Sequence, residues 1–294
     1  MIYLENLKIP SDIAEMSYIA SAPRISYPGM YPFKVFPLKQ LEHIEFSNIT
    51  IFYGGNGSGK TTLLNVIAEK IGAIRHSEFN KTPFFDDYVS FCKIYGKTIP
   101  QNSQILSSDD VFDYVMNMRY LNSNVDFHRE ELFRGYGLQM KKAGSEEGYI
   151  QLHGLSDYDR WKEVHDALSF GPSKFVKERL ARNVDMFSNG ETAMRYFTDH
   201  IDRDAVYLLD EPENSLSIGF QMELAKYIEA SARHFNCQFI ISTHSPILLS
   251  LNDAQIYDLD SSPVITKKWT ELENVRSYYE FFKARENEFE KRED

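Results

Sequence analysis

The feature that most constrains this sequence is a glycine-rich segment, residues 54–62, which reads Gly-Gly-Asn-Gly-Ser-Gly-Lys-Thr-Thr. It has the spacing of a phosphate-binding loop: a glycine, four residues, and then Gly-Lys-Thr. Glycines allow consecutive backbone N–H groups to converge on phosphate oxygens without a clash of Cβ atoms. The lysine would face the β- and γ-phosphates, and the first threonine hydroxyl would bind Mg²⁺. The residues expected to contact the nucleotide here are Gly54, Asn56, Gly57, Ser58, Gly59, Lys60, Thr61 and Thr62.

The segments on either side of this loop have the patterns of a strand and a helix. Residues 48–53 are apolar and β-branched, as in a buried strand. Residues 62–71 repeat apolar side chains at helical spacing. A strand, a glycine loop and a helix in this order place a phosphate at the helix N-terminus, which argues against a chance glycine turn.

Composition limits the class of protein. The 294 residues are 43% hydrophobic, enough for one large or two smaller domains with a sizeable core. A net charge of −11 argues against a generally basic nucleic-acid-binding protein, but not against one local basic stripe. The two cysteines, Cys92 and Cys237, have no metal-binding spacing and fit a reducing compartment. Since we find no N-terminal leader and no run of 18 apolar residues, we expect a cytoplasmic protein without a membrane span.

Two acidic residues follow an apolar segment later in the chain. Asp210 and Glu211 come directly after residues 206–209, which have the pattern of a buried strand. In a parallel sheet, the C-terminal end of such a strand meets the phosphate loop. Asp210 is then placed to bind Mg²⁺ together with Thr61, and Glu211 to orient and polarise the attacking water. Two acids after an apolar run are also common on surfaces, but the phosphate loop in the same chain favours the functional interpretation.

The order and spacing of these motifs resemble the ABC-type ATPases, in particular the soluble branch with RecF, SMC and OLD-like proteins. Within that branch, the chain is most similar to standalone bacterial ATPases that have no attached domain. Residues 54–61 and 210–217 are similar to the first Walker motif and to the second Walker motif with its D-loop. Residues 187–191, Phe-Ser-Asn-Gly-Glu, look like a divergent signature motif, and residues 242–246 look like the switch-histidine segment.

The resemblance implies a head-to-tail homodimer with ATP between the two copies. Ser188 and Gly190 of one copy would contact the γ-phosphate held by Lys60 of the other, and His244 would donate a hydrogen bond to it. The alternative for Ser188 is an ordinary helix cap, and the motif has Asn189 where the family commonly has glycine. The catalytic residues implied are Glu211, His244, Lys60 and Ser188.

Two parts of the family's site stay open in the sequence. The glutamine that completes the Mg²⁺ shell could be Gln101 or Gln104, and neither sits in a convincing motif. The aromatic residue that stacks on adenine could be Tyr27, Tyr31 or Phe33.

Strands that alternate with helices predict an α/β fold. With the resemblance, this is a P-loop NTPase of the ABC type: a mostly parallel sheet flanked by helices, an N-terminal antiparallel β subdomain and an inserted helical lobe. The single domain would divide into an N-terminal β region with the phosphate loop (1–74), the inserted lobe (75–185), the core from signature to switch histidine (186–260) and a tail (261–294). Further strands are expected at 2–4, 33–36 and 44–46, and helices at 109–120, 161–168, 174–182 and in the tail.

Three hypotheses about function follow. The leading one is Mg-ATP hydrolysis by an ATP-sandwiched homodimer that drives or times a separate effector protein, with a DNA-related or phage-defence role admitted by resemblance. The second is a nucleotide-gated binding module with little turnover, read by a partner protein or nucleic acid; four basic residues within 174–182 could form a stripe for the latter or an ordinary solvated face. The third is a transporter ATPase subunit, which the aromatic middle region and acidic charge disfavour.

Overall fold

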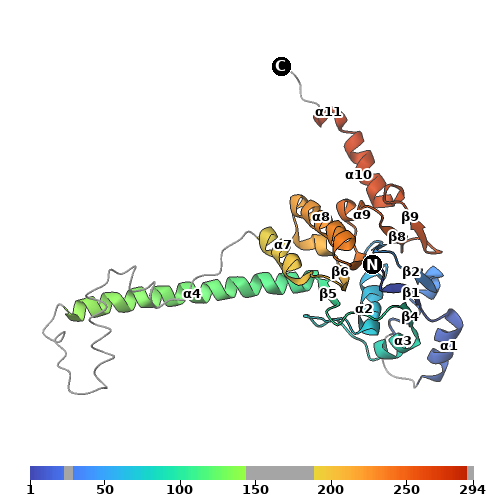
Figure 1. The fold of residues 1–294 in the computed structure, drawn as a ribbon, viewed down its shortest axis with the longest axis horizontal. Helices are drawn as coiled ribbons and strands as arrows, with labels where there is room; N and C mark the ends of the chain where they lie inside the picture. Colours follow the sequence, from blue (N-terminus) through green and yellow to red (C-terminus); the bar gives the residue numbers. More distant parts are fainter. Residues whose placement is uncertain (23–28, 144–188, 290–294) are drawn as a thin grey trace. The chain divides into compact units, whose positions relative to one another are not determined.

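A computed structural model describes residues 1–22, 29–143 and 189–289 (Figure 1). The chain divides into two compact units, residues 1–112 together with 189–294, and residues 113–188. The helices expected at 161–168 and 174–182 lie outside the described residues, with the basic residues they carry. Among the residues that the structure describes, no helix is long and apolar enough to cross a membrane.

The first unit contains a six-stranded sheet in the order β5-β6-β7-β3-β8-β9, parallel except at β9. Its strands are β5 (Gln104–Ser107), β6 (Val206–Asp210), β7 (Gln238–Ser242), β3 (Ile49–Tyr53), β8 (Gln255–Asp258) and β9 (Ile265–Lys267). The strand before the phosphate loop, β3, is central, and every residue of it is buried. This arrangement confirms the predicted mostly parallel α/β sheet.

A second sheet of three antiparallel strands confirms the predicted antiparallel subdomain. Its order is β2-β1-β4. The strands are β1 (Leu4–Lys8), β2 (His43–Glu45) and β4 (Lys93–Gly96). Both β4 and β5 come from the range that the sequence assigns to the inserted lobe, and both join the sheets of the first unit.

Helices and short 3-10 turns connect these strands. They are α1 (Asp12–Ser21), α2 (Lys60–Ile71), α3 (Phe85–Phe91), α4 (Ser108–Ala143), α7 (Asn189–His200), α8 (Ile218–His234), α9 (Pro246–Leu249), α10 (Glu273–Lys283), α11 (Glu286–Phe289), η1 (Pro37–Lys39), η3 (Pro212–Ser215) and η4 (Trp269–Glu271). Helix α2 is capped at its C-terminal end by Gly72, which has a φ of +66°. The Gly72 N–H donates to the carbonyls of Ala68 and Glu69, as in a glycine C-cap. The expected single tail helix is divided into α10 and α11.

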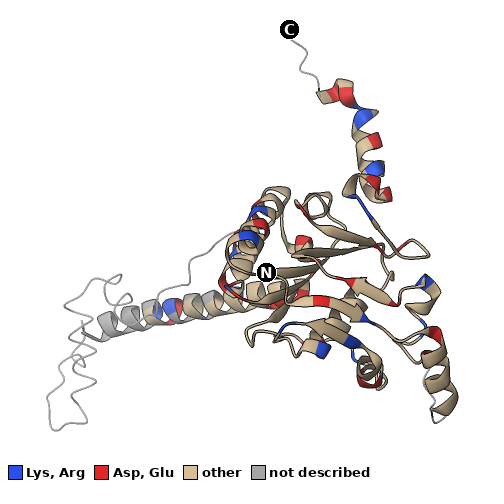
Figure 2. Cartoon of the chain, turned by 45° about the vertical axis from the view of Figure 1, so that its right-hand side comes forward, with Lys and Arg blue, Asp and Glu red and all other residues tan. Residues whose placement is uncertain are grey.

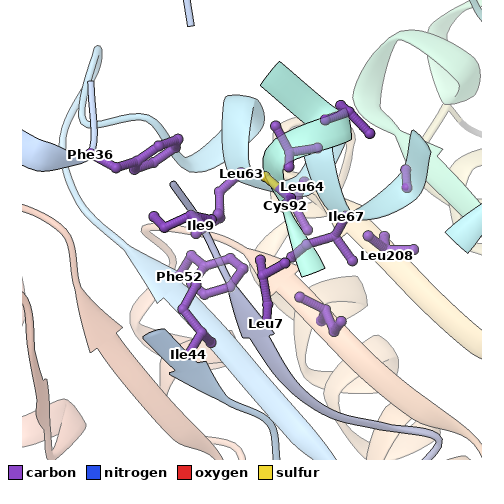
Figure 3. Packing of buried hydrophobic residues seen from close by; sticks show 14 of the residues in the cluster. Leu7, Ile9, Phe36, Ile44, Phe52, Leu63, Leu64, Ile67, Cys92 and Leu208 are labelled. Carbon is purple, nitrogen blue, oxygen red and sulfur yellow. The ribbon is translucent and has the colours of Figure 1, made fainter. Parts of the chain in front are cut away.

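Helix α2 and strands of both sheets contribute to one apolar core (Figure 3). Residues of this core that Figure 3 labels are Leu7, Ile9, Phe36, Ile44, Phe52, Leu63, Leu64, Ile67, Cys92 and Leu208. The core fixes the N-terminus of α2, and therefore the phosphate loop, against the central sheet.

One buried side chain also joins the two sheets. Gln238, at the start of β7, accepts hydrogen bonds from the backbone N–H groups of Tyr3 (2.9 Å) and Leu4 (2.8 Å). Its amide donates to the carbonyls of Leu4 (2.8 Å) and Ser47 (3.0 Å). Because buried backbone groups need partners, this amide replaces a strand-to-strand ladder at the junction.

The prediction of a strand at residues 33–36 is wrong. This segment forms turns between two prolines and leads into η1. Phe33 and Phe36 are both buried, three residues apart, on a turn that begins at a proline, so they fill the core without the alternation of a strand. The strand expected at 2–4 lies later, at Leu4–Lys8.

Candidate nucleotide site

The loop of residues 54–59 joins the C-terminal end of β3 to the N-terminus of α2, as predicted. Gly57 and Gly59 have φ angles of +79° and +97°, which residues with a Cβ rarely adopt. A Cβ on Gly54 would lie 2.5 Å from the Ser58 hydroxyl oxygen. The backbone path therefore requires glycine at these positions, as expected for a loop that presents its N–H groups to phosphate.

Lys60 is the first residue of α2 and is only 4% exposed. Its Nζ donates hydrogen bonds to the carbonyls of Gly54 (2.6 Å) and Gly55 (3.2 Å). It also lies 3.4 Å from Oε1 of Glu211. The structure thus brings together the cation of the phosphate loop and the predicted catalytic carboxylate, which are 151 positions apart in the numbering of the sequence.

Asp210 ends β6 next to the same loop. The Thr61 hydroxyl donates to Oδ1 of Asp210 at 3.1 Å, and the Ser242 hydroxyl donates to the same oxygen. Burial raises the pKa of the Asp210 carboxyl, against the effect of these two hydrogen bonds. A hydroxyl and a carboxylate oxygen are hard ligands of the kind that Mg²⁺ prefers, so these residues fit the predicted magnesium site.

Glu211 begins the turn after β6 and has a left-handed backbone, with φ of +47°. Its N–H donates to the Ser242 carbonyl at 3.0 Å. The Asn214 amide donates to Oε2 of the Glu211 carboxylate at 3.1 Å. The carboxylate is therefore held between Asn214 and Lys60, at the C-terminal edge of the sheet.

His244 follows β7, and its side chain is 45% exposed. The buried carboxylate of Glu213 accepts a hydrogen bond from the His244 backbone N–H at 2.9 Å and lies 3.6 Å from the ring Nδ1. On its open side, the histidine lines a cavity of about 470 Å³ with Tyr278 and Phe282 of α10.

Only part of the predicted signature segment can be described. Ser188 lies outside the described residues, and α7 begins at Asn189. A Cβ on Gly190 would lie 2.8 Å from the ring of Phe220 in α8, so the packing of α7 on α8 already requires a glycine there. Of the other loop residues, Asn56 is exposed at the tip and Ser58 is buried.

Sequence reasoning missed two residues that belong to this region. The Gly55 N–H donates to Oδ2 of Asp260 at 2.8 Å, which anchors the phosphate loop to the segment after β8. Arg75 lines a cavity of about 640 Å³ together with Thr61 and Asp210. Burial lowers the pKa of its guanidinium, although nearby carboxylates oppose this effect. Neither residue belongs to a sequence motif. Arg75 follows the end of α2, and Asp260 follows the end of β8.

The structure describes most of the candidates for the glutamine of the Mg²⁺ shell and for the aromatic residue that stacks on adenine. Gln104 begins β5 at the sheet edge opposite to the phosphate loop and donates to the His200 carbonyl, and Gln101 precedes it. Phe33 is buried and stacks on Tyr18, with ring centroids 4.6 Å apart. The Tyr31 hydroxyl forms a hydrogen bond with the hydroxyl of Thr62, which leaves it beside the phosphate loop. Tyr27 lies outside the described residues.

A mostly parallel sheet with a phosphate loop, a lysine and two acids at its carboxyl edge defines a P-loop nucleoside triphosphatase. A family model described as "ABC transporter" matches residues 42–214, more than half of the chain, and the chain belongs to this family of ABC-type ATPases. A second model, "AAA ATPase domain", matches residues 186–249. Membership indicates a protein that binds and hydrolyses ATP, with Mg²⁺ as the usual companion ion.

Solved structures with similarity to the chain include two SMC head domains. The head from Pyrococcus furiosus, bound to the C-terminal domain of ScpA, is 13% identical, covers 97% of this chain and 100% of its own, and has a TM-score of 0.43. The head from Thermotoga maritima is 13% identical, covers 91% and 99%, and has a TM-score of 0.38. A nucleotide-free ATP-binding cassette from an ABC transporter is 17% identical, covers 99% and 100%, and has a TM-score of 0.40. No curated protein matches the chain.

Proposed function

We propose that this protein binds Mg-ATP and hydrolyses it in a head-to-tail homodimer with ATP at the interface. The observation that carries the proposal is the meeting of Lys60, Thr61, Asp210 and Glu211 at one edge of the parallel sheet. The Lys60–Glu211 separation of 3.4 Å and the Thr61–Asp210 bond of 3.1 Å are the supporting distances.

Each residue has a role that follows from its chemistry. Loop N–H groups and the Lys60 ammonium would bind the phosphates, and Thr61 and Asp210 would hold Mg²⁺, which neutralises phosphate charge. Glu211 would orient a water molecule and accept its proton, because its carboxylate lies 3.4 Å from Nζ of Lys60, the atom that would contact the phosphates. His244, on the adjacent strand end, would donate to the γ-phosphate.

The second copy is proposed because the phosphate loop of one copy would contact only some of the γ-phosphate oxygens and would leave the others open to donors from a second copy. Ser188, which precedes α7 in the sequence, and Gly190, in the first turn of α7, would supply the contacts from the partner copy, since a helix N-terminus favours an anion. A separate effector protein would use the resulting change of association; a DNA-related or phage-defence role rests on the family resemblance alone. The two cysteines are free and buried, which supports the proposed cytoplasmic setting.

The test replaces Glu211 with glutamine. Glu211→Gln keeps the size of the side chain but removes the base, so ATP affinity should stay within about twofold of the parent and turnover should fall roughly 100-fold or more. Glu5→Gln, an exposed change on β1, is the matched control and should behave as the parent. A Glu211→Gln protein that hydrolyses ATP at the parental rate would overturn the assignment.

The second candidate is a nucleotide-gated binding module with little turnover. The close contact of Gly190 with Phe220 favours it, because packing alone explains the glycine of the signature segment. Turnover measured with and without DNA, RNA and candidate effector proteins separates the two functions. A parent that binds Mg-ATP tightly, but hydrolyses it no faster than Glu211→Gln under all these conditions, would favour the module.

A further inference from the structure

A buried carboxylate connects the turn after β6 with the loop that carries His244. Glu213 lies in η3 and is only 7% exposed. Its Oε1 accepts hydrogen bonds from the Thr243 hydroxyl (2.6 Å) and from the His244 backbone N–H (2.9 Å). Its Oε2 is buried and has no hydrogen-bond partner in the described part of the chain.

The burial of this acid is costly and needs an explanation. A carboxylate taken out of water loses free energy unless hydrogen bonds compensate, and an unpaired oxygen adds to that cost. An apolar side chain at this position would avoid the free-energy cost of removing a carboxylate from water. The two groups that Glu213 does satisfy belong to consecutive residues of one loop, so the acid fixes the path of that loop.

The loop is also held on its other side. The Ser245 N–H donates to the Thr243 hydroxyl oxygen (3.0 Å), and the Ser245 hydroxyl donates to Gln221 of α8 (2.7 Å). Among residues 243–245, His244 alone has an exposed side chain, and both of its neighbours are buried and hydrogen-bonded. Its backbone has a fixed position while its ring faces the open side.

The same turn carries the proposed general base. Glu211 and Glu213 flank Pro212, which restricts the backbone between them. The Glu211 N–H is bonded to Ser242 of β7, and the Glu213 carboxylate to the two residues that follow Ser242. The segment that follows β6 is therefore joined twice to the end of β7 and the residues after it, first between Glu211 and Ser242 and then between Glu213 and the pair Thr243 and His244.

We propose that Glu213 is a positioning residue for His244. Its carboxylate holds the histidine backbone at a set distance from Glu211, so that the imidazole reaches the γ-phosphate while Glu211 holds the water. Glu213 itself would contact neither the γ-phosphate nor the water. Its contacts with the histidine are the backbone N–H at 2.9 Å and the ring Nδ1 at 3.6 Å. This inference rests on the proposed function, because it takes His244 as a contact of the γ-phosphate.

The test compares Glu213→Ala, Glu213→Gln and His244→Ala. Alanine removes the acceptor, so kcat should fall roughly 10- to 100-fold, as expected for a displaced catalytic group, with ADP affinity unchanged. Glutamine keeps a carbonyl acceptor of the same length and should restore at least half of the parental kcat. In Glu213→Ala/His244→Ala, the loss should be no larger than in His244→Ala alone, because Glu213 acts through the histidine.

Folding and function are separated by two further measurements. Glu213→Asp retracts the carboxylate by one methylene but keeps its charge; it should lose kcat as alanine does with a smaller fall in Tm. The control Glu229→Ala removes an acid of α8 that also accepts a backbone N–H, from Asn252, and should keep the parental kcat.

Parental kcat in both Glu213→Ala and Glu213→Asp, or losses that multiply in the double variant, would overturn the positioning role. If the parent itself shows no turnover, the proposed function fails, and the positioning role is then judged by binding. A ratio of ATP to ADP affinity that falls in Glu213→Ala as it does in His244→Ala supports it, and an unchanged ratio contradicts it.

Discussion

At the scale of single residues, the site depends on a few polar groups that are buried together. Lys60 is almost fully buried, and its partners are two carbonyls of its own loop and Glu211. A buried ammonium needs such partners, and the phosphate oxygens of a nucleotide are acceptors of the same kind with more negative charge. The lysine is therefore held in place by the contacts that a nucleotide would share or replace.

Glu15 allows a test of buried charge outside the site. It is 1% exposed in α1, and burial raises the pKa of its carboxyl above the ordinary value of 4.5, although the Lys34 N–H donates to it. The native state then keeps a proton that the unfolded chain loses, so stability falls as the pH rises above about 4.5. Glu15→Gln should raise Tm at pH 8, and the gain should shrink toward pH 5.

The exposed change Glu5→Gln is the control and should show no gain that depends on pH. A Glu15→Gln protein that is less stable than the parent at pH 8 would show that the charged form is needed, and would contradict the direction of the shift.

At the scale of secondary-structure elements, the sequence predicted well where the pattern was long or carried a motif. The series β3, phosphate loop and α2 was predicted within two residues, because apolar periodicity and glycine spacing agree there. The elements β4, β5, α1 and α3 were missed, since they are short and partly polar and gain their stability from neighbours. For the same reason Arg75 and Asp260 could not be found: only the folded chain brings them to the loop.

Gln238 gives a prediction about how the elements are joined. Gln238→Leu would keep most of the volume but leave the N–H groups of Tyr3 and Leu4 and the carbonyls of Leu4 and Ser47 without their partner. We expect a loss of about 3 kcal/mol or more in the free energy of unfolding by urea. Gln255→Leu, on β8 of the same sheet, removes one bond to the Tyr257 hydroxyl and should cost about 1 kcal/mol. Equal costs for the two variants would show that Gln238 does not join the sheets.

At the scale of the whole molecule, the described residues provide one side of the proposed site. The phosphate loop, both acids and His244 all belong to the first compact unit, at the ends of β3, β6 and β7. The same unit has a tail, α10 and α11, on which acidic and basic residues alternate (Figure 2). Four aromatic side chains of α10 are about half exposed, a composition typical of surfaces that meet another molecule.

The proposed homodimer leads to a test of mass. Glu211→Gln should bind Mg-ATP without consuming it, so saturating Mg-ATP should double the molar mass measured by light scattering. ADP should leave the mass unchanged, because it lacks the γ-phosphate that both copies would hold. Lys60→Met, which removes the cation of the loop, is the matched control and should stay monomeric. A Glu211→Gln protein that keeps its monomer mass in saturating Mg-ATP would exclude the sandwiched dimer.

The position of β3 has a consequence for how the chain reaches its native state. This strand is synthesised long before both of its sheet neighbours, β7 and β8, which begin at Gln238 and Gln255. Until then its apolar residues have no partner strand in this sheet, a state that is prone to aggregation. Pairings of such high contact order form slowly. The nucleotide site, assembled from the ends of β3, β6 and β7, can form only after β7 has left the ribosome, so ATP binding reports that these strands have paired.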